Sequence, residues 1–156
     1  MQPFHTRFAL PFPVSDKVVL VVDDIPLVLN VTEAVIKSLG YATEATLSPV
    51  EALRKLQGRP DAYCALVTDF SMPELTGLEL AREVRKSLPM LPVIFYTGSI
   101  DFDLQRDASY LGFTAYLAKP ALRNELAEIL GAMILESVAA SLHADNVKRA
   151  LMRDAI

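Results

Sequence analysis

Short apolar runs alternate with longer amphipathic segments from residue 17 onward. The first run, VVLVVDD, is continuously apolar from Val18 to Val22, which is typical of a parallel strand covered on both faces. A weaker strand is expected at residues 41–45. The segments ALVTD, PVIFYT and TAYLAK predict three more strands, which end at Asp69, Thr97 and Lys119.

Helix signals fill the intervals between these strands. Pro26 suits the first turn of a helix that ends at Gly40. Its expected inward positions are Leu27, Val28, Val31, Ala34 and Val35. A short helix at residues 103–111, before Gly112, and a last helix from about residue 122 complete the series.

Two further helices open with capping-box patterns, in which a hydroxyl residue is followed three positions later by Glu. These pairs are Ser48 with Glu51 and Thr76 with Glu79. Their expected inward residues are Ala52, Leu53 and Leu56 in the first helix and Leu80, Val84 and Leu88 in the second.

Five strands that alternate with five helices predict an α/β fold, a doubly wound parallel sheet with right-handed crossovers. The length of 156 residues fits one domain with modest extensions. We assign residues 17–134 to this domain, residues 1–16 to an N-terminal tail or linker, and residues 135–156 to a C-terminal helical extension. The tail carries Phe4, Phe8 and Phe12 at four-residue spacing; these could dock on a partner, although an incidental terminal segment is the simpler interpretation.

Composition and charge narrow the functional class. Hydrophobic residues make up 52% of the chain, so it can build a full core, and the net charge of −4 without a Lys/Arg cluster does not indicate nucleic-acid binding. No uninterrupted apolar stretch is long enough to cross a bilayer and no secretory signal is present, so we expect a cytoplasmic protein without membrane insertion. The single cysteine, Cys64, is expected to be an inert core residue.

Polar side chains gather where the predicted strands end. Asp23 and Asp24 end the first strand, Asp69 the third, Thr97 the fourth and Lys119 the fifth. Each residue taken alone could be a turn former, a helix cap or a solvated side chain. Because ligands of doubly wound sheets bind outside the carboxyl ends of the strands, the five residues together predict one site.

The chemistry of this site follows from its charges. Three clustered carboxylates resist joint ionisation unless a cation offsets them, and Mg²⁺ suits a partly hydrated site with a couple of carboxylates. With Mg²⁺ and the Lys119 ammonium the local charge is neutral. One carboxylate can then act as the nucleophile of aspartyl-phosphate chemistry, while the cations stabilise the phosphoryl oxygens.

The ordered motifs VVLVVDD, LVTDFSMPELTG, VIFYTGS and AYLAKP resemble the receiver domain of two-component response regulators. The resemblance covers about residues 17–134 and implies a flavodoxin-like sheet with strand order 2-1-3-4-5. It also implies a phosphoacceptor of phosphorelay signalling that catalyses only its own phosphorylation and dephosphorylation and is not a turnover enzyme.

The family roles fall on matching residues. Asp24 would bind Mg²⁺ directly and Asp23 mainly through water, while Asp69 would be both a metal ligand and the nucleophile that takes a phosphoryl group from a phosphohistidine. The backbone carbonyl of Ser71 would complete the protein's share of the coordination. Lys119 would pair with the phosphoryl group, and the Lys119–Pro120 bond is expected to be cis.

The same resemblance implies a switch. Thr97 would reorient its hydroxyl toward the phosphoryl group, and Gly98 would leave room for phosphodonors and offer its N–H. Tyr116 matches the family's aromatic position whose ring turns inward, with an ordinary strand aromatic as the alternative interpretation.

Three positions affect the expected affinity for Mg²⁺ and the expected lifetime of the phosphoryl group. Ile25 stands where many relatives carry a third acidic residue, so the metal affinity is expected to be lower. Ser71 and Ser99 supply neither an amide nor a carboxylate to position an attacking water, which leaves the lifetime of the phosphoryl group open.

Two other classes of protein fit parts of the pattern. An aspartate-nucleophile phosphatase also uses Asp and Mg²⁺, but that family resembles DxDxT, whereas Phe70 and Ser71 follow Asp69 here. A nucleotide binder of flavodoxin type would need a glycine-rich loop after the first strand, where this chain is acidic. Neither His5 nor His143 has a setting that indicates a phosphodonor.

The resemblance implies a histidine kinase or histidine phosphotransfer protein as donor. It also implies a downstream target at the face formed by the fourth helix, the fifth strand and the fifth helix. Residues 135–156 are too few for an output domain, so the chain looks like a stand-alone receiver or a part of a hybrid kinase. The pattern of apolar residues there indicates an extra amphipathic helix, with Leu142, Val147, Ala150 and Leu151 on its apolar side. This helix could support a homodimer, dock on the receiver or fray.

Overall fold

The structure is a computed structural model that describes residues 16–99 and 101–153. Its sheet has the order β2-β1-β3-β4-β5, and every neighbouring pair of strands is parallel. The strands are β1 (Val18–Val22), β2 (Ala42–Thr46), β3 (Tyr63–Thr68), β4 (Val93–Thr97) and β5 (Thr114–Ala118). The predicted fold class and strand order are therefore confirmed.

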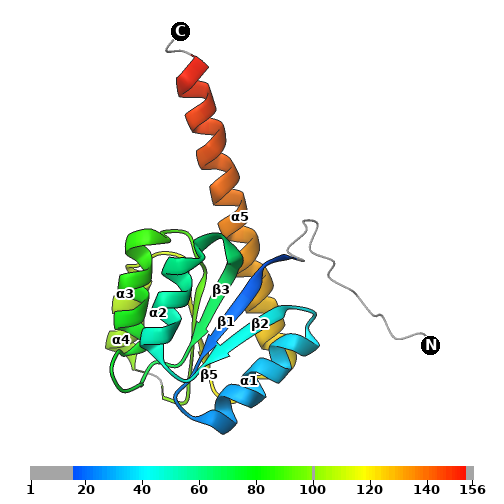
Figure 1. Ribbon diagram of the computed structural model, residues 1–156, viewed down its shortest axis with the longest axis vertical. Coiled ribbons are helices and arrows are strands. Elements are labelled where there is room, and N and C mark those ends of the chain that lie inside the picture. Colours follow the sequence, from blue (N-terminus) through cyan, green and yellow to red (C-terminus); the bar gives the residue numbers. More distant parts are fainter. Residues whose placement is uncertain (1–15, 100, 154–156) are drawn as a thin grey trace, which may run out of the picture.

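Helices cover both faces of this sheet, which gives three layers (Figure 1). One layer contains α1 (Pro26–Ser38) and α5 (Arg123–Arg153), and the other contains α2 (Pro49–Gly58), α3 (Gly77–Ser87) and α4 (Phe102–Ser109). A short 3-10 turn, η2 (Pro60–Ala62), leads into β3.

The central strands supply both halves of the core because successive side chains of a strand point to opposite faces. Leu20 and Phe95 pack with the layer of α2, α3 and α4, whereas Val21 and Ile94 pack with α1 and α5. All four side chains are buried. This two-sided burial explains why the strands read as uninterrupted apolar runs in the sequence.

The predicted inward face of α1 is wrong. The buried residues of this helix are Leu29, Thr32 and Ile36. Of the predicted positions, Val28 and Val35 are half-buried, and Leu27, Val31 and Ala34 are exposed. Apolar residues occur on nearly every side of α1, so periodicity alone could not select the side that packs on β1 and β2.

The two capping boxes have different outcomes. Thr76 Oγ1 accepts a hydrogen bond from the Glu79 N–H at 3.2 Å, and the Glu79 carboxylate accepts one from the Thr76 N–H at 2.8 Å, which confirms the box that opens α3. At α2, Ser48 Oγ accepts from the Glu51 N–H at 3.2 Å, but the Glu51 carboxylate accepts from the Thr46 hydroxyl at 2.9 Å. The reciprocal half of that box is thus replaced by a bond to the end of β2.

The C-terminal helix is continuous. The expected last helix and the extra helix hinted at for residues 135–156 are both parts of α5, which has 31 residues. Its first half buries Leu126, Leu130, Met133 and Ile134 against the sheet, and its second half extends past the domain (Figure 1). The domain boundaries at residues 16 and 134 stay predictions, and the second of them falls inside this helix.

By length and composition α5 could also cross a membrane, and among the described residues it is the one helix that meets this criterion. One such helix is weak evidence, since core helices of soluble proteins meet the same criterion.

The N-terminal residues 1–15, which include His5 and the three phenylalanines of the predicted tail, lie outside the described residues. Cys64 lies in β3 and is buried, as expected of an inert core residue. Burial raises the pKa of its thiol to about 11.

Candidate functional site

The acidic residues meet because β1 and β3 are neighbours in a parallel sheet. The Asp23 N–H donates to the Thr46 carbonyl at 3.3 Å, and the Asp69 N–H donates to the Val22 carbonyl at 3.0 Å, so the backbone ladder continues one residue past each strand. Asp23, Asp24 and Asp69 each offer one carboxylate oxygen, and these three oxygens lie within 4.8 Å of one another. The structure thus brings together the three carboxylates that the sequence placed at the strand ends.

Lys119 reaches into this cluster from the end of β5. Its Nζ lies 2.5 Å from Asp23 Oδ2 and 3.5 Å from Asp69 Oδ1. Its backbone N–H donates to the Thr97 carbonyl at 2.8 Å, which aligns the ends of β4 and β5. The Lys119–Pro120 bond is cis, as expected.

The donor set fits a hard divalent cation. Three carboxylates and one ammonium leave two negative charges, which an ion such as Mg²⁺ would offset with oxygen ligands alone. Both oxygens of Asp23 already have partners, since Oδ1 accepts from the Ile25 N–H at 3.0 Å and Oδ2 pairs with Lys119. Asp24 is half-buried and has no ion pair among the described residues, so its carboxylate is the more available ligand. Ser71 is exposed, two residues after Asp69.

The predicted switch residues lie at the end of β4 and in the neighbouring strand β5. Thr97 is buried at the end of β4, and a Cβ added at Gly98 would meet no atom within 4 Å. The Tyr116 hydroxyl donates to the Ser99 carbonyl at 2.8 Å, and the Tyr116 ring lies 6.0 Å from the Phe70 ring between centroids. Burial is the main cause that raises the pKa of Tyr116. In this state Tyr116 therefore holds the segment that follows β4.

Gly77 is a supporting residue that the sequence did not single out. A Cβ at this position would lie 2.2 Å from the backbone oxygen of Asp69, and the Gly77 N–H donates to the Phe70 carbonyl at 2.8 Å. Only glycine lets the start of α3 approach the backbone of Asp69 this closely. The sequence offered one indication of this role: Gly77 directly follows the N-cap Thr76. Glycine is a poor helix former, so its presence in the first turn of a helix indicates a requirement other than helix propensity.

Tyr96 is a second such residue. Its hydroxyl accepts from the Ala121 N–H at 3.2 Å, and its ring lies 5.4 Å from Lys119 Nζ. Tyr96 thereby supports the turn after Lys119. Its ring packs on the face of the sheet opposite to Phe95. In the sequence it reads as an ordinary strand aromatic.

The sequence of this chain is similar to those of known receiver proteins. The family model described as the response regulator receiver domain matches residues 19–131. A two-component response regulator of Arabidopsis thaliana is 36% identical over 110 residues, which are 69% of this chain and 20% of that protein. Hybrid signal transduction histidine kinase L of Dictyostelium discoideum is 30% identical over 118 residues, which are 72% of this chain and 7% of that protein. The chain thus spans a fifth or less of the length of these two relatives.

Solved structures give the same picture. A response regulator receiver domain protein from Clostridium thermocellum has a TM-score of 0.75 and 28% identity, with 80% of this chain and 98% of that chain covered. The receiver domain of a sensor histidine kinase from Pseudomonas aeruginosa has a TM-score of 0.66 and 31% identity, with 76% and 97% covered. That structure is described with a magnesium ion coordinated in its active-site cleft.

Proposed function

Because the chain belongs to the response regulator receiver domain family, we propose that Asp69 accepts a phosphoryl group from a phosphohistidine of a kinase or phosphotransfer protein. Receiver domains are phosphoacceptor signalling domains of two-component systems and not classical enzymes. The observation that carries the proposal is the setting of Asp69: its carboxylate is close to those of Asp23 and Asp24 and 3.5 Å from an ammonium.

In the proposed transfer, a carboxylate oxygen of Asp69 attacks the phosphorus atom. A P–O bond forms, the N–P bond to the donor histidine breaks, and the departing imidazole nitrogen takes a proton from solvent. Bound Mg²⁺ would supply charge neutralisation on the phosphoryl oxygens. Asp24, Asp69 and the Ser71 carbonyl would hold the ion directly and Asp23 through water.

Lys119 has two partners available in this scheme. Before transfer it pairs with Asp23 and lies near Asp69, and after transfer its ammonium can turn to a phosphoryl oxygen. The open space beside Gly98 leaves a path for the donor, and the Gly98 N–H can face the phosphoryl group. These residues would let the domain assist its own phosphorylation and dephosphorylation.

The switching step would use Thr97 and Tyr116. The phosphoryl group adds charge and acceptor oxygens that attract the Thr97 hydroxyl, and movement of Thr97 would open space into which the Tyr116 ring can turn. The altered surface would then be the face formed by α4, β5 and α5. Phe102 and Tyr110, each 81% exposed, offer aromatic contact area for a downstream target there. The cytoplasmic location and the homodimer stay predictions.

Intact-mass measurement after incubation with acetyl phosphate or phosphoramidate and Mg²⁺ tests the proposal. We expect one added phosphoryl group in the wild-type chain and in an Asp61→Asn control, because Asp61 is exposed in η2, which precedes the start of β3, whereas Asp69 follows the end of that strand. We expect none in Asp69→Asn, since the amide keeps the shape but lacks the nucleophilic charge. Equal labelling of Asp69→Asn would overturn the assignment.

A further inference from the structure

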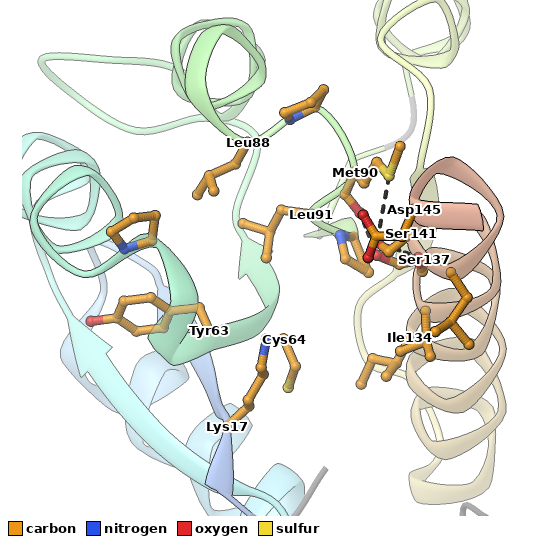
Figure 2. A pocket seen from close by; sticks show the side chains of 15 residues that line it. Lys17, Tyr63, Cys64, Leu88, Met90, Leu91, Ile134, Ser137, Ser141 and Asp145 are labelled. Carbon is orange, nitrogen blue, oxygen red and sulfur yellow. Dashed lines mark hydrogen bonds between the residues drawn. The ribbon is translucent and has the colours of Figure 1, made fainter. Parts of the chain in front are cut away.

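A cavity of about 460 Å³ lies at the edge of the sheet opposite the carboxylates. It is bounded by the starts of β1 and β3, the connection from α3 to β4 and the second half of α5 (Figure 2). Small-molecule sites have volumes of about 300–1,000 Å³, so the cavity is large enough to hold apolar side chains. It lies apart from every residue of the proposed phosphorylation site.

Most of the residues that line this cavity are apolar. They include Tyr63, Leu91, Ile134 and Val138, together with three prolines, which have no backbone N–H to donate. Leu142, at the α5 side, is half exposed to solvent. No described residue fills the cavity, so this apolar surface is left to an occupant from elsewhere.

The frame of the cavity is fixed by hydrogen bonds. The Ser137 hydroxyl donates to the Met90 carbonyl at 2.6 Å, and the Ser141 hydroxyl, which also lies 3.0 Å from the Ser137 carbonyl, is 3.5 Å from the Met90 sulfur (Figure 2). These bonds hold α5 across the connection from α3 to β4. The cavity is therefore a preformed feature of the fold.

The N-terminal residues 1–15 join the described chain at this cavity, because Lys17 is one of its lining residues. The segment is apolar, with three phenylalanines, Leu10 and Val14, and Arg7 is its one Lys, Arg, Asp or Glu residue. An extended chain spans roughly 3.3 Å per residue, so residues 1–15 can reach every wall. A short tether also gives an effective concentration on the order of millimolar, which favours the segment over a free ligand.

The charges of the cavity and of the N-terminal segment are also complementary. Asp145 lines the cavity and forms no ion pair within the described part of the chain. Arg7 lies between Phe4 and Phe8 in the sequence, so a docked segment can bring its guanidinium to this carboxylate.

We propose that the N-terminal segment docks in this cavity of its own chain, with Phe8 and Phe12 as the aromatic anchors. Phe12 and Phe8 are the two phenylalanines closest to the tether at Lys17. The docked segment straps the second half of α5 to the start of β3, in addition to the contacts of α5 with Met90 and of Val138 with the core.

Cys64 provides the reporter, because it is the single cysteine of the chain, lines the cavity and keeps 8% of its surface exposed, so that its slow reaction with a thiol reagent depends on whether the cavity is filled. We expect the full-length Phe8→Ala/Phe12→Ala variant to react with 4,4′-dithiodipyridine about tenfold faster than wild type, the ratio for a segment docked roughly nine-tenths of the time. Phe102→Ala, the same change at an exposed position of α4, should leave the rate unchanged. A synthetic peptide of residues 1–15 should slow the reaction of the double variant.

Methyl NMR separates docking from damage to the fold. The Met90 methyl signal should shift in the double variant because the neighbouring rings are lost, whereas the Met72 signal, from the opposite core layer, should not. Equal Cys64 rates in wild type and double variant would overturn the proposal. So would a protection of Cys64 that disappears on dilution, because the occupant would then be the segment of a second copy.

Discussion

The Lys119 ammonium bridges two carboxylates, 2.5 Å from an oxygen of Asp23 and 3.5 Å from an oxygen of Asp69. It therefore serves part of the charge balance that a divalent cation would serve. A divalent cation bound at these carboxylates would compete with the Lys119 ammonium for their negative charge, and this competition can be measured.

We expect Lys119→Gln to bind Mg²⁺ about thirtyfold more tightly, from the ~2 kcal/mol by which an ammonium about 4 Å away repels a divalent ion in water. The same variant should label more slowly with acetyl phosphate, because the ammonium that would meet the phosphoryl oxygens is absent. Calorimetric titration and intact mass provide the two readouts, with Lys86→Gln as a surface control. Weaker Mg²⁺ binding would show that Lys119 supports the metal and does not compete with it.

Mg²⁺ should raise the melting temperature of the unphosphorylated chain, since an ion that binds only the folded state stabilises it by mass action. At a hundred times its dissociation constant this amounts to about 2.7 kcal/mol. Asp24→Asn should reduce the response more than Asp23→Asn, because Asp23 already has partners for both oxygens. Thermal melts with and without Mg²⁺ decide the matter, and a full response in the double Asn variant would remove the metal site from the mechanism.

Thr97→Ala should still accept a phosphoryl group on Asp69, but the signal should reach the face formed by α4, β5 and α5 only weakly. A ligand shifts an equilibrium only through different interactions with its two states, and the Thr97 hydroxyl is proposed to supply that difference. Amide NMR shifts across α4, β5 and α5, with and without beryllofluoride, measure the coupling. Shifts equal to those of wild type at matched occupancy would mean that the coupling takes another route.

Gly77→Ala should destabilise the fold by about 3 kcal/mol, the upper end of the range for overpacking, because its Cβ would meet the Asp69 backbone and not a flexible side chain. Gly58→Ala is the matched control, since an added Cβ there meets nothing within 4 Å. It should be neutral or stabilising by up to ~1 kcal/mol, from helix propensity. Urea unfolding of both variants tests this, and similar stabilities would exclude a close approach at Gly77.

Acid should weaken a second polar cluster, at the outer edge of the sheet. Hydrogen bonds from Arg59, and next from Tyr63 and Lys55, hold the pKa of the Glu44 carboxyl below its ordinary value of 4.5. A lowered carboxyl pKa contributes stability above the unfolded-state value, and this contribution is lost as the pH falls through the folded-state value. Glu44→Gln should therefore lose about 1 kcal/mol at neutral pH and progressively less in acid. Urea unfolding across this pH range measures the gap, and a constant gap would contradict it.

The strand-end residues could be predicted because their positions depend on two local signals. Continuous apolar runs locate the ends of β1, β3, β4 and β5, and the parallel order then forces Asp23, Asp69 and Lys119 to one edge. The side of α1 that packs inward could not be predicted, because Leu27 and Leu29 are equally apolar and only the position of the sheet distinguishes them.

The ion pair between Lys119 and Asp23 and the close backbone contact at Gly77 could not be predicted from the sequence either. The contact between Gly77 and the Asp69 backbone joins residues eight positions apart through a loop in which Glu74 adopts a left-handed φ of 71°. The bond between Lys119 and Asp23 depends on the distance across β3 and β4, which no local pattern encodes. Such relationships exist only once the layers have packed.

The uninterrupted course of α5 makes it a lever arm. A helix rises 1.5 Å per residue, so the part after Ile134 is roughly 28 Å long. A tilt of about 5° at the anchored end would displace the far end by roughly 2.5 Å, since displacement grows in proportion to this length. Ångström-scale repacking beneath Leu126 and Leu130 would thus be magnified at Arg153, whatever that end of the helix meets.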